Sequence, residues 1–179
     1  MNSEKVAEIY AANQRAREKV IAAVKDLSAE RSLSPLEGEK WSIAQVTEHI
    51  AMVADAAARI CAKLLGQSEA ADVESDADTA FSDTFLTKSK EIAAIKLQAP
   101  ERVQPVGGQS IEQSLAKLTA VSSRFDELRP LFEQYDCREQ TFPHPFFGEL
   151  NAVEWLALAG LHAERHVKQV ESLKSKLRP

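Results

Sequence analysis

The chain has 179 residues, which indicates one domain, residues 1–179, long enough to bury a core without disulfides or a structural metal. Its formal net charge of -5 excludes general nucleic-acid binding, which needs a basic face. No apolar run approaches the ~20 residues of a membrane span, and the N-terminus lacks the apolar core of a secretory signal.

The first predicted helix covers residues 3–27. Its apolar residues recur at steps of three and four, the spacing of one helix face. These residues are Val6, Ile9, Tyr10, Val20, Ile21, Val24 and Leu27. A loop that contains Pro35 and Gly38 is expected to follow.

The second predicted helix begins at Ser42 and stops at Gly66. Ser42 and Gln45 have the spacing of a capping box, in which each side chain satisfies a free backbone N–H. We expect an exposed, acidic loop over residues 67–79, a shorter helix over residues 81–97 and a connection over residues 100–108.

The third predicted helix begins at Ser110, which forms a second capping-box pattern with Gln113. Its apolar face runs from Ile111 to Phe132 at helical spacing. Pro130 is expected to disturb the end of this helix, because proline lacks a backbone N–H and disfavours helix at the residue before it.

The fourth predicted helix begins at Asn151, with Glu154 completing a third capping box, and runs to about Leu177. Before it, residues 141–148 are rich in aromatic residues and proline, and we interpret them as a loop. Four long amphipathic helices with connections of unequal length predict an all-α four-helix bundle.

Two histidines of the fourth helix, His162 and His166, have the spacing of neighbours on one helix face. They share a stripe with Trp155, Ala159, Val170 and Leu173, so both should point inward. A buried imidazole needs a partner for its ring nitrogens, since an unsatisfied buried polar group costs ~1–3 kcal/mol. A metal ion bound by both side chains would meet this need.

His49 lies on the apolar stripe of the second helix, between Val46 and Val53. Together with His162 and His166 it predicts a three-nitrogen site with open coordination positions, as in catalytic rather than structural zinc sites. Imidazole ligands admit zinc, nickel, iron or copper. Spacing alone leaves the alternative of three hydrogen-bonded core histidines.

The spacing of His162 and His166 also occurs in zincin proteases, but the general base of that motif is missing. Ala163 occupies the position where zincins have glutamate, and Glu164 should face away and pair with Lys168. Glu48 is expected to face solvent, because it lies about 100° around the helix from its neighbour His49.

The two cysteines, Cys61 and Cys137, are far apart in sequence and lack metal-ligand spacing. We interpret both as packed thiols rather than nucleophiles. Free thiols in a chain without an export signal indicate a cytoplasmic location.

Three segments of the sequence resemble the DinB-like (DinB/YfiT-like) superfamily. They are Trp41-Ser42-x-x-Gln45-Val46-x-x-His49-Ile50, His144-Pro145-Phe146-Phe147-Gly148-x-Leu150-Asn151-x-x-Glu154-Trp155 and His162-x-x-x-His166-x-x-Gln169-Val170. The similarity covers the second and fourth helices well, and the remainder only as a four-helix outline.

This resemblance implies an up-down-down-up four-helix bundle whose metal ligands are His49, His162 and His166. It also implies a homodimer and a metal-dependent enzyme acting on a small molecule, with zinc, nickel or iron as the metal. The family includes S-transferases and isomerases that use a low-molecular-weight thiol (bacillithiol, mycothiol or glutathione), and proteins described as hydrolases.

His144 matches a histidine that is frequent in the family but is not a metal ligand. It is a candidate for orienting a ligand, contacting substrate or capping the last helix. Two other functions stay open: a non-catalytic, stress-related metal-binding or dimeric helical protein, and a helical module whose three histidines are structural. Trp41 and Trp155 are expected to anchor the core.

Overall fold

The computed structural model describes residues 3–68, 81–93, 95 and 97–177 of the chain. Its elements, in chain order, are α1 (Ser3–Val24), α2 (Ala29–Leu33), α3 (Ile43–Leu65), α4 (Asp83–Ala93), the 3-10 helix η1 (Glu101–Val103), α5 (Ile111–Gln134), β1 (Thr141–His144), β2 (Gly148–Asn151) and α6 (Ala152–Lys176).

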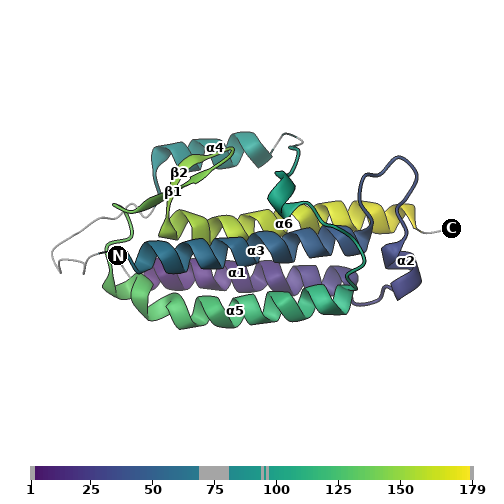
Figure 1. Cartoon of the computed structure of the whole chain (residues 1–179), viewed down its shortest axis with the longest axis horizontal. Coiled ribbons are helices and arrows are strands. Elements are labelled where there is room, and N and C mark those ends of the chain that lie inside the picture. Colours follow the sequence, from purple (N-terminus) through teal and green to yellow (C-terminus); the bar gives the residue numbers. More distant parts are fainter. Residues whose placement is uncertain (1–2, 69–80, 94, 96, 178–179) are drawn as a thin grey trace.

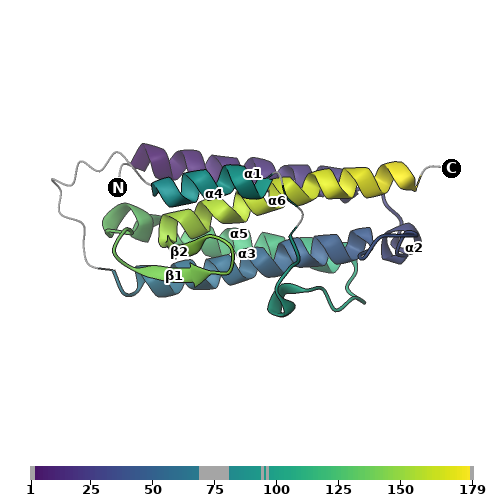
Figure 2. The same ribbon diagram turned by 90° about the horizontal axis from the view of Figure 1, so that it is seen from above.

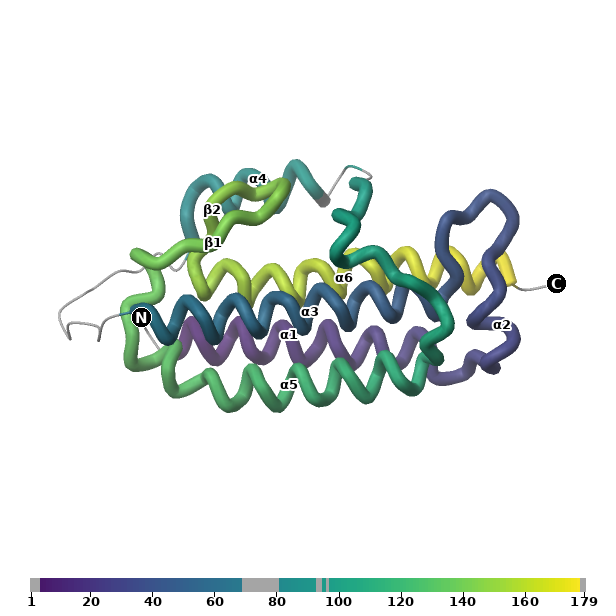
Figure 3. The backbone as a smooth tube through the Cα atoms, in the orientation of Figure 1, coloured from purple at the N-terminus to yellow at the C-terminus, as the bar shows by residue number. Residues whose placement is uncertain are grey.

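The long helices α1, α3, α5 and α6 lie side by side as a four-helix bundle (Figure 1, Figure 2). Helix α3 packs against both α5 and α6, and α1 packs against α6. The colours of Figure 3 show that α1 and α6 run in one direction and α3 and α5 in the other. The predicted up-down-down-up bundle is therefore confirmed, with a small hairpin added to it.

All three predicted capping boxes are present. Ser42 with Gln45, Ser110 with Gln113 and Asn151 with Glu154 each exchange side-chain hydrogen bonds with backbone N–H groups at the start of α3, α5 and α6. Helix α3 ends at Leu65 with Gly66 as its C-cap, as predicted. These local signals fix where the helices that carry the histidines begin.

Two helix ends differ from the prediction. Helix α1 stops at Val24, and the expected loop after it contains the short helix α2, whose N-cap Ser28 accepts a hydrogen bond from the amide of Arg31. Helix α5 continues past Pro130 to Gln134. The carbonyl that Pro130 leaves without a donor belongs to Asp126, an exposed residue, where water can take the place of the missing N–H.

The prediction of a loop over residues 141–148 is wrong, because this segment belongs to an antiparallel hairpin. Strand β1 pairs with β2 in a register that joins Thr141 to Asn151 and His144 to Gly148. Gly148, the first residue of β2, has a φ of +82°, a conformation that L side chains rarely adopt and that glycine supplies at tight turns.

The hairpin and α4 form a small layer on the bundle above the first turns of α6 (Figure 1). Trp155 of α6 anchors this layer, because its indole N–H donates to the carbonyl of Phe142 at 3.2 Å. The rings of Phe85 in α4 and Phe147 in the hairpin lie 5.6 Å apart. The predicted shorter helix is present as α4, whereas most of the predicted acidic loop, residues 67–79, lies outside the described residues.

The seam between α1 and α6 depends on a glycine in the middle of α6. A Cβ added at Gly160 would lie 2.1 Å from Oδ1 of Asn13, whose side-chain amide donates to the carbonyl of Leu156. The missing side chain therefore lets the two helices approach closely. Over the described residues, no helix is long and apolar enough to cross a membrane.

Candidate metal centre

The bundle brings His49, His162 and His166 together, although 113 residues separate the first two in sequence. Their ring centroids lie 4.4–4.8 Å apart, and one nitrogen of each ring lies within 4.8 Å of those of the other two. His49 comes from α3, and the other two come from successive turns of α6. The convergence that the helical stripes predicted is thus confirmed.

The distance between the Nε2 atoms of His49 and His162 is 3.1 Å. Two imidazole nitrogens on one tetrahedral zinc ion lie about 3.4 Å apart, given a Zn–N distance of about 2.1 Å. The spacing of these two nitrogens therefore fits one metal ion with little movement, and the nitrogen of His166 lies within 4.8 Å of both. Three neutral nitrogens suit zinc, nickel, iron or copper.

Two of the histidines are oriented by hydrogen-bond acceptors that face their outer ring nitrogens, the Nδ1 atoms on the side away from the cluster. The Nδ1 atom of His49 lies 2.6 Å from the carbonyl oxygen of Val103, and Nδ1 of His166 lies 2.7 Å from Oε1 of Gln169. These contacts assign the proton of each ring to Nδ1, so Nε2 carries the lone pair that a metal ion would bind. Acceptors of this kind commonly fix the tautomer of metal-binding histidines.

The environment keeps all three imidazoles neutral at pH 7. Burial lowers the pKa of His49, and the hydrogen bond to Val103 partly offsets this effect. Burial, with His166 and His49 nearby, lowers the pKa of His162 well below its ordinary value. Burial and His49 lower the pKa of His166 to about 4. Neutral imidazole is the form that binds metal ions.

We expect the free energy of unfolding of the metal-free protein to fall as the pH drops from 6.5 toward 4. A histidine in the unfolded chain takes up its proton near pH 6.5, whereas folded His166 resists protonation down to about pH 4. The contribution of neutral His166 to the free energy of unfolding is therefore fully present above pH 6.5 and is lost as the pH falls from 6.5 to 4. Between pH 7 and pH 5 the loss is roughly 1–2 kcal/mol. Urea unfolding of wild type and His166→Gln at pH 7 and pH 5, with a chelator present, measures this loss. An equal pH dependence of the unfolding free energy in both proteins would contradict the prediction.

The two histidines of α6 are more exposed than His49 of α3. His49 is buried at 3% exposure, while His162 and His166 are half-buried. Within the described ranges, no cysteine or carboxylate joins the three nitrogens in the group. A metal held here would keep positions open for water or a substrate.

Glu48 lies elsewhere than predicted, and Glu164 has a different partner from the one predicted. Glu48 does not face solvent: it is buried at 1% exposure and accepts hydrogen bonds from the amides of Val106 and Gly107. Glu164 does face away from the cluster, but it pairs with Lys19 of α1 at 2.6 Å rather than with Lys168. The spacing within one helix cannot reveal either partner, because both come from other segments.

His144 lies outside the group of three histidines, in the hairpin. Its Nδ1 accepts hydrogen bonds from the amides of Phe146 and Phe147, and its ring packs 5.2 Å from that of Trp155. Burial lowers its pKa to about 4. This geometry gives His144 a place in the hairpin turn, and its role toward a ligand or substrate stays a prediction.

Three further groups support the centre. Gln169 follows His166 by three residues, so helical spacing could have identified it.

Arg165 donates to the carbonyls of Ile92 and Ile95 at 2.5 Å each, which ties the C-terminal end of α4 to α6. The ring of Trp41 lies 4.9 Å from that of His49, so this partly buried tryptophan packs on the site as well as on the core.

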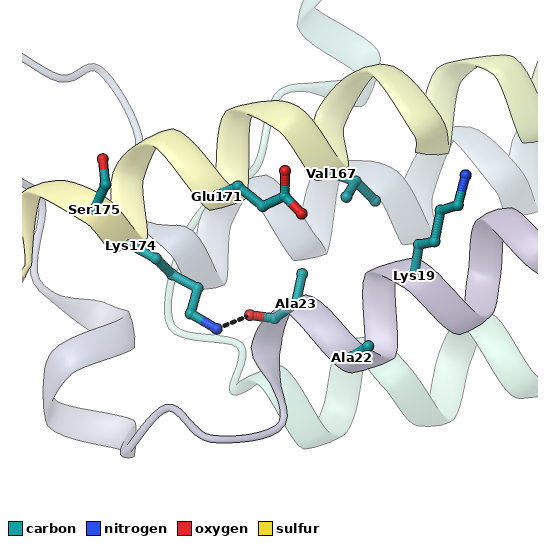
Figure 4. Close-up of a pocket in the computed structure, with 7 residues that line it drawn as sticks. All are labelled: Lys19, Ala22, Ala23, Val167, Glu171, Lys174 and Ser175. Atoms are coloured by element: carbon teal, nitrogen blue, oxygen red, sulfur yellow. Dashed lines mark hydrogen bonds between the residues drawn. The ribbon is translucent and has the colours of Figure 1, made fainter.

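An open groove of about 510 Å³ lies on the seam of α1 and α6, and none of the three histidines lines it (Figure 4). Its lysines are already engaged: Lys174 donates to the carbonyl of Ala23 in the last turn of α1, and Lys19 pairs with Glu164. The first contact is the expected interaction of a cation with a helix C-terminus. We therefore assign the groove a structural role.

Comparison with known proteins agrees with this architecture. The sequence profile of the DinB superfamily matches residues 12–170. The uncharacterized protein YuaE of Bacillus subtilis (strain 168) is 25% identical over 165 residues, covering 86% of this chain and 90% of YuaE. The crystal structure of TT2238, a four-helix bundle protein, superposes with a TM-score of 0.58 at 23% identity, covering 92% of this chain and 96% of TT2238.

Proposed function

The chain belongs to the DinB superfamily, and on that premise we propose that it is a metal-dependent enzyme in which His49, His162 and His166 hold one divalent transition metal ion. The observation that carries the proposal is the convergence of three neutral imidazoles with no fourth protein ligand among the described residues. When bound, such an ion acts as a Lewis acid and lowers the pKa of the group that it binds.

The protein's own groups prepare this site. Val103 and Gln169 hold the outer nitrogens of His49 and His166, so both Nε2 atoms point inward before a metal arrives. The surrounding apolar packing keeps the imidazoles unprotonated. Because the ligands are fixed in advance, little ordering is needed on binding.

The buried cysteines favour an external thiol over an internal nucleophile. Burial raises the pKa of the Cys61 thiol, and burial raises that of Cys137 to about 11, so both stay protonated at pH 7. Cys61 also lies 3.4 Å from the carbonyl of Ala152, inside the core. We therefore propose that the substrate is a small molecule and that any reacting thiol is a cosubstrate, as in thiol-dependent S-transfer; hydrolysis is the other reaction type.

A second candidate is a metal-binding protein without catalytic activity. The observation that favours it is the position of the open groove, which lies on the α1–α6 seam and not at the histidines. The homodimer expected from the family resemblance also remains a prediction for either candidate.

We expect turnover only from metal-loaded wild type when zinc-, nickel- and iron-loaded protein is tested with a low-molecular-weight thiol and a small electrophile. The same screen should include small esters and amides without a thiol. His162→Ala, treated identically, should be inactive because it lacks a ligand. Bound metal without turnover on any of these substrates would favour the second candidate.

A further inference from the structure

We propose that Glu48 is a positioning residue for the metal site: it holds residues 101–107, here called the strap, so that the Val103 carbonyl fixes the ring of His49. This inference rests on the proposed function for its metal-binding consequence. Its structural part, the control of the His49 tautomer, can be tested without any metal.

Glu48 and His49 are neighbours on α3 and contact the same short segment. The two carboxylate oxygens of Glu48 accept hydrogen bonds from the amides of Val106 and Gly107, each at 3.2 Å. His49 Nδ1 lies 2.6 Å from the carbonyl oxygen of Val103, three residues earlier in the strap. A shift of the strap would therefore move the acceptor of a metal ligand.

Little else holds the strap on the bundle. None of its side chains is buried, and that of Val106 is 86% exposed, so apolar burial contributes little to its position. Its other backbone hydrogen bonds are local, such as that from the Gln104 amide to the Glu101 carbonyl. The carboxylate of Glu48 and the ring of His49 are thus its main polar anchors among the described residues.

The chemistry of Glu48 fits this task. Successive backbone N–H groups form a concave site for anions, and Gly107, with a φ of +82°, supplies the required turn. Glu48 is 1% exposed, and no lysine or arginine of the described ranges pairs with it. Burying a carboxyl group is costly unless its hydrogen bonds are made, so a buried glutamate that spends both oxygens on the amides of the strap indicates more than core packing.

The consequence for the metal site follows from the tautomer of His49. With Val103 as acceptor, the proton stays on Nδ1, and Nε2 directs its lone pair toward His162, whose Nε2 lies 3.1 Å away. Without that acceptor the proton can occupy either nitrogen, and the ring can rotate. Loss of such outer partners typically weakens metal binding 10–100-fold.

The test compares Glu48→Gln with Glu154→Gln. Glu154 is a matched control, because it is also a buried carboxylate that accepts backbone N–H groups, but it lies eight residues before His162 in α6, about 12 Å along the helix. Zinc affinity is measured by competition with a chelating dye. We expect a loss of about 10–100-fold for Glu48→Gln and less than about twofold for Glu154→Gln. Equal affinities in wild type and Glu48→Gln would overturn the proposal.

A second variant disturbs the same contact from the strap. Val106→Pro removes one amide donor to Glu48 without changing α3, and the side chain that it replaces is exposed. It should weaken zinc binding in the same direction, by about tenfold. If both variants bind zinc as tightly as wild type, Glu48 has no positioning role.

The metal-free readout is the ¹⁵N spectrum of the histidine rings. Wild-type His49 should be the Nδ1–H tautomer, and Glu48→Gln should show both tautomers, while His144 keeps its Nδ1 as an acceptor in both proteins. An unchanged His49 signal in Glu48→Gln would overturn the inference. Wild type that binds no zinc would instead refute the proposed function, and the ring spectrum would still decide the role of Glu48.

Discussion

Replacing His162 with alanine is expected to lower zinc affinity by at least a hundredfold. Its Nε2 is 3.1 Å from that of His49, and its ring lies next to both other imidazoles, so the variant leaves two nitrogens where three converge. Loss of a direct ligand should exceed the 10–100-fold effect of losing an outer hydrogen bond. Isothermal titration of the untagged proteins with zinc measures this difference.

His144→Ala is the control for that experiment. His144 is also a neutral imidazole and is half-buried, like His162, but it lies in the hairpin and outside the group of three. Its removal should leave zinc affinity within about threefold of wild type while destabilising the hairpin turn, where two amides lose their acceptor. If His144→Ala weakens zinc binding as much as His162→Ala does, the assignment of the ligands is wrong.

Glu154→Ala is expected to lower the free energy of unfolding by about 3 kcal/mol. The buried carboxylate accepts from the amide and hydroxyl of Ser82 and from the amide of Asn151, so it joins the segment that leads into α4 to the N-terminus of α6. Two losses make up this value. Losing the capping-box contact with Asn151 costs about 1 kcal/mol, and leaving the amide and hydroxyl of Ser82 without a carboxylate acceptor costs about 1.5–3 kcal/mol. Urea unfolding measures it.

Gln113→Ala provides the comparison. Gln113 completes the same type of capping box at the start of α5, but its hydrogen bonds are exposed to solvent. Its loss should cost less than about 1 kcal/mol, since water can satisfy the freed N–H. Equal effects of the two substitutions would show that Glu154 acts only as a helix cap and does not hold the α4 layer.

The parts of the fold that were predicted correctly depend on local sequence signals. Capping residues such as Ser42 and Asn151 mark helix starts from spacing alone. A 3.6-residue repeat places His162 and His166 on the same face of α6, where both rings meet that of His49. A bundle of four such helices has few ways to bury its apolar faces. The convergence of His49 with the other two histidines follows from that constraint.

The hairpin was not predicted, for a physical reason. Its strands have four residues each, too few for a clear alternation, and Pro143 within β1 argues against a strand that is paired on both sides. Strand β1 tolerates this proline because, among the residues that the structure describes, β1 pairs with β2 alone. The sequence signal for this turn was Gly148, which directly follows Pro145-Phe146-Phe147, because glycine supplies the positive φ that a tight turn needs.

The surroundings of the histidines could not be derived from helical spacing. Glu48 is buried because the strap covers it, and the contacting amides come from residues 58 and 59 positions later. The acceptor of His49 is a backbone carbonyl, which carries no residue-specific signal. Gln169 is the exception among these partners, because it lies three residues after His166 on the same helix, a spacing that can be read from the sequence.

The most direct measurement is the metal content of wild type and of the double variant His162→Ala/His166→Ala, both purified without a histidine tag. Each protein is incubated with zinc or nickel, free ions are removed, and the bound metal is determined by elemental analysis. A site of three converging imidazoles predicts about one transition-metal ion per wild-type chain and almost none in the double variant. No metal in either protein, or equal amounts in both, would contradict the metal centre and leave a helical bundle with three structural histidines.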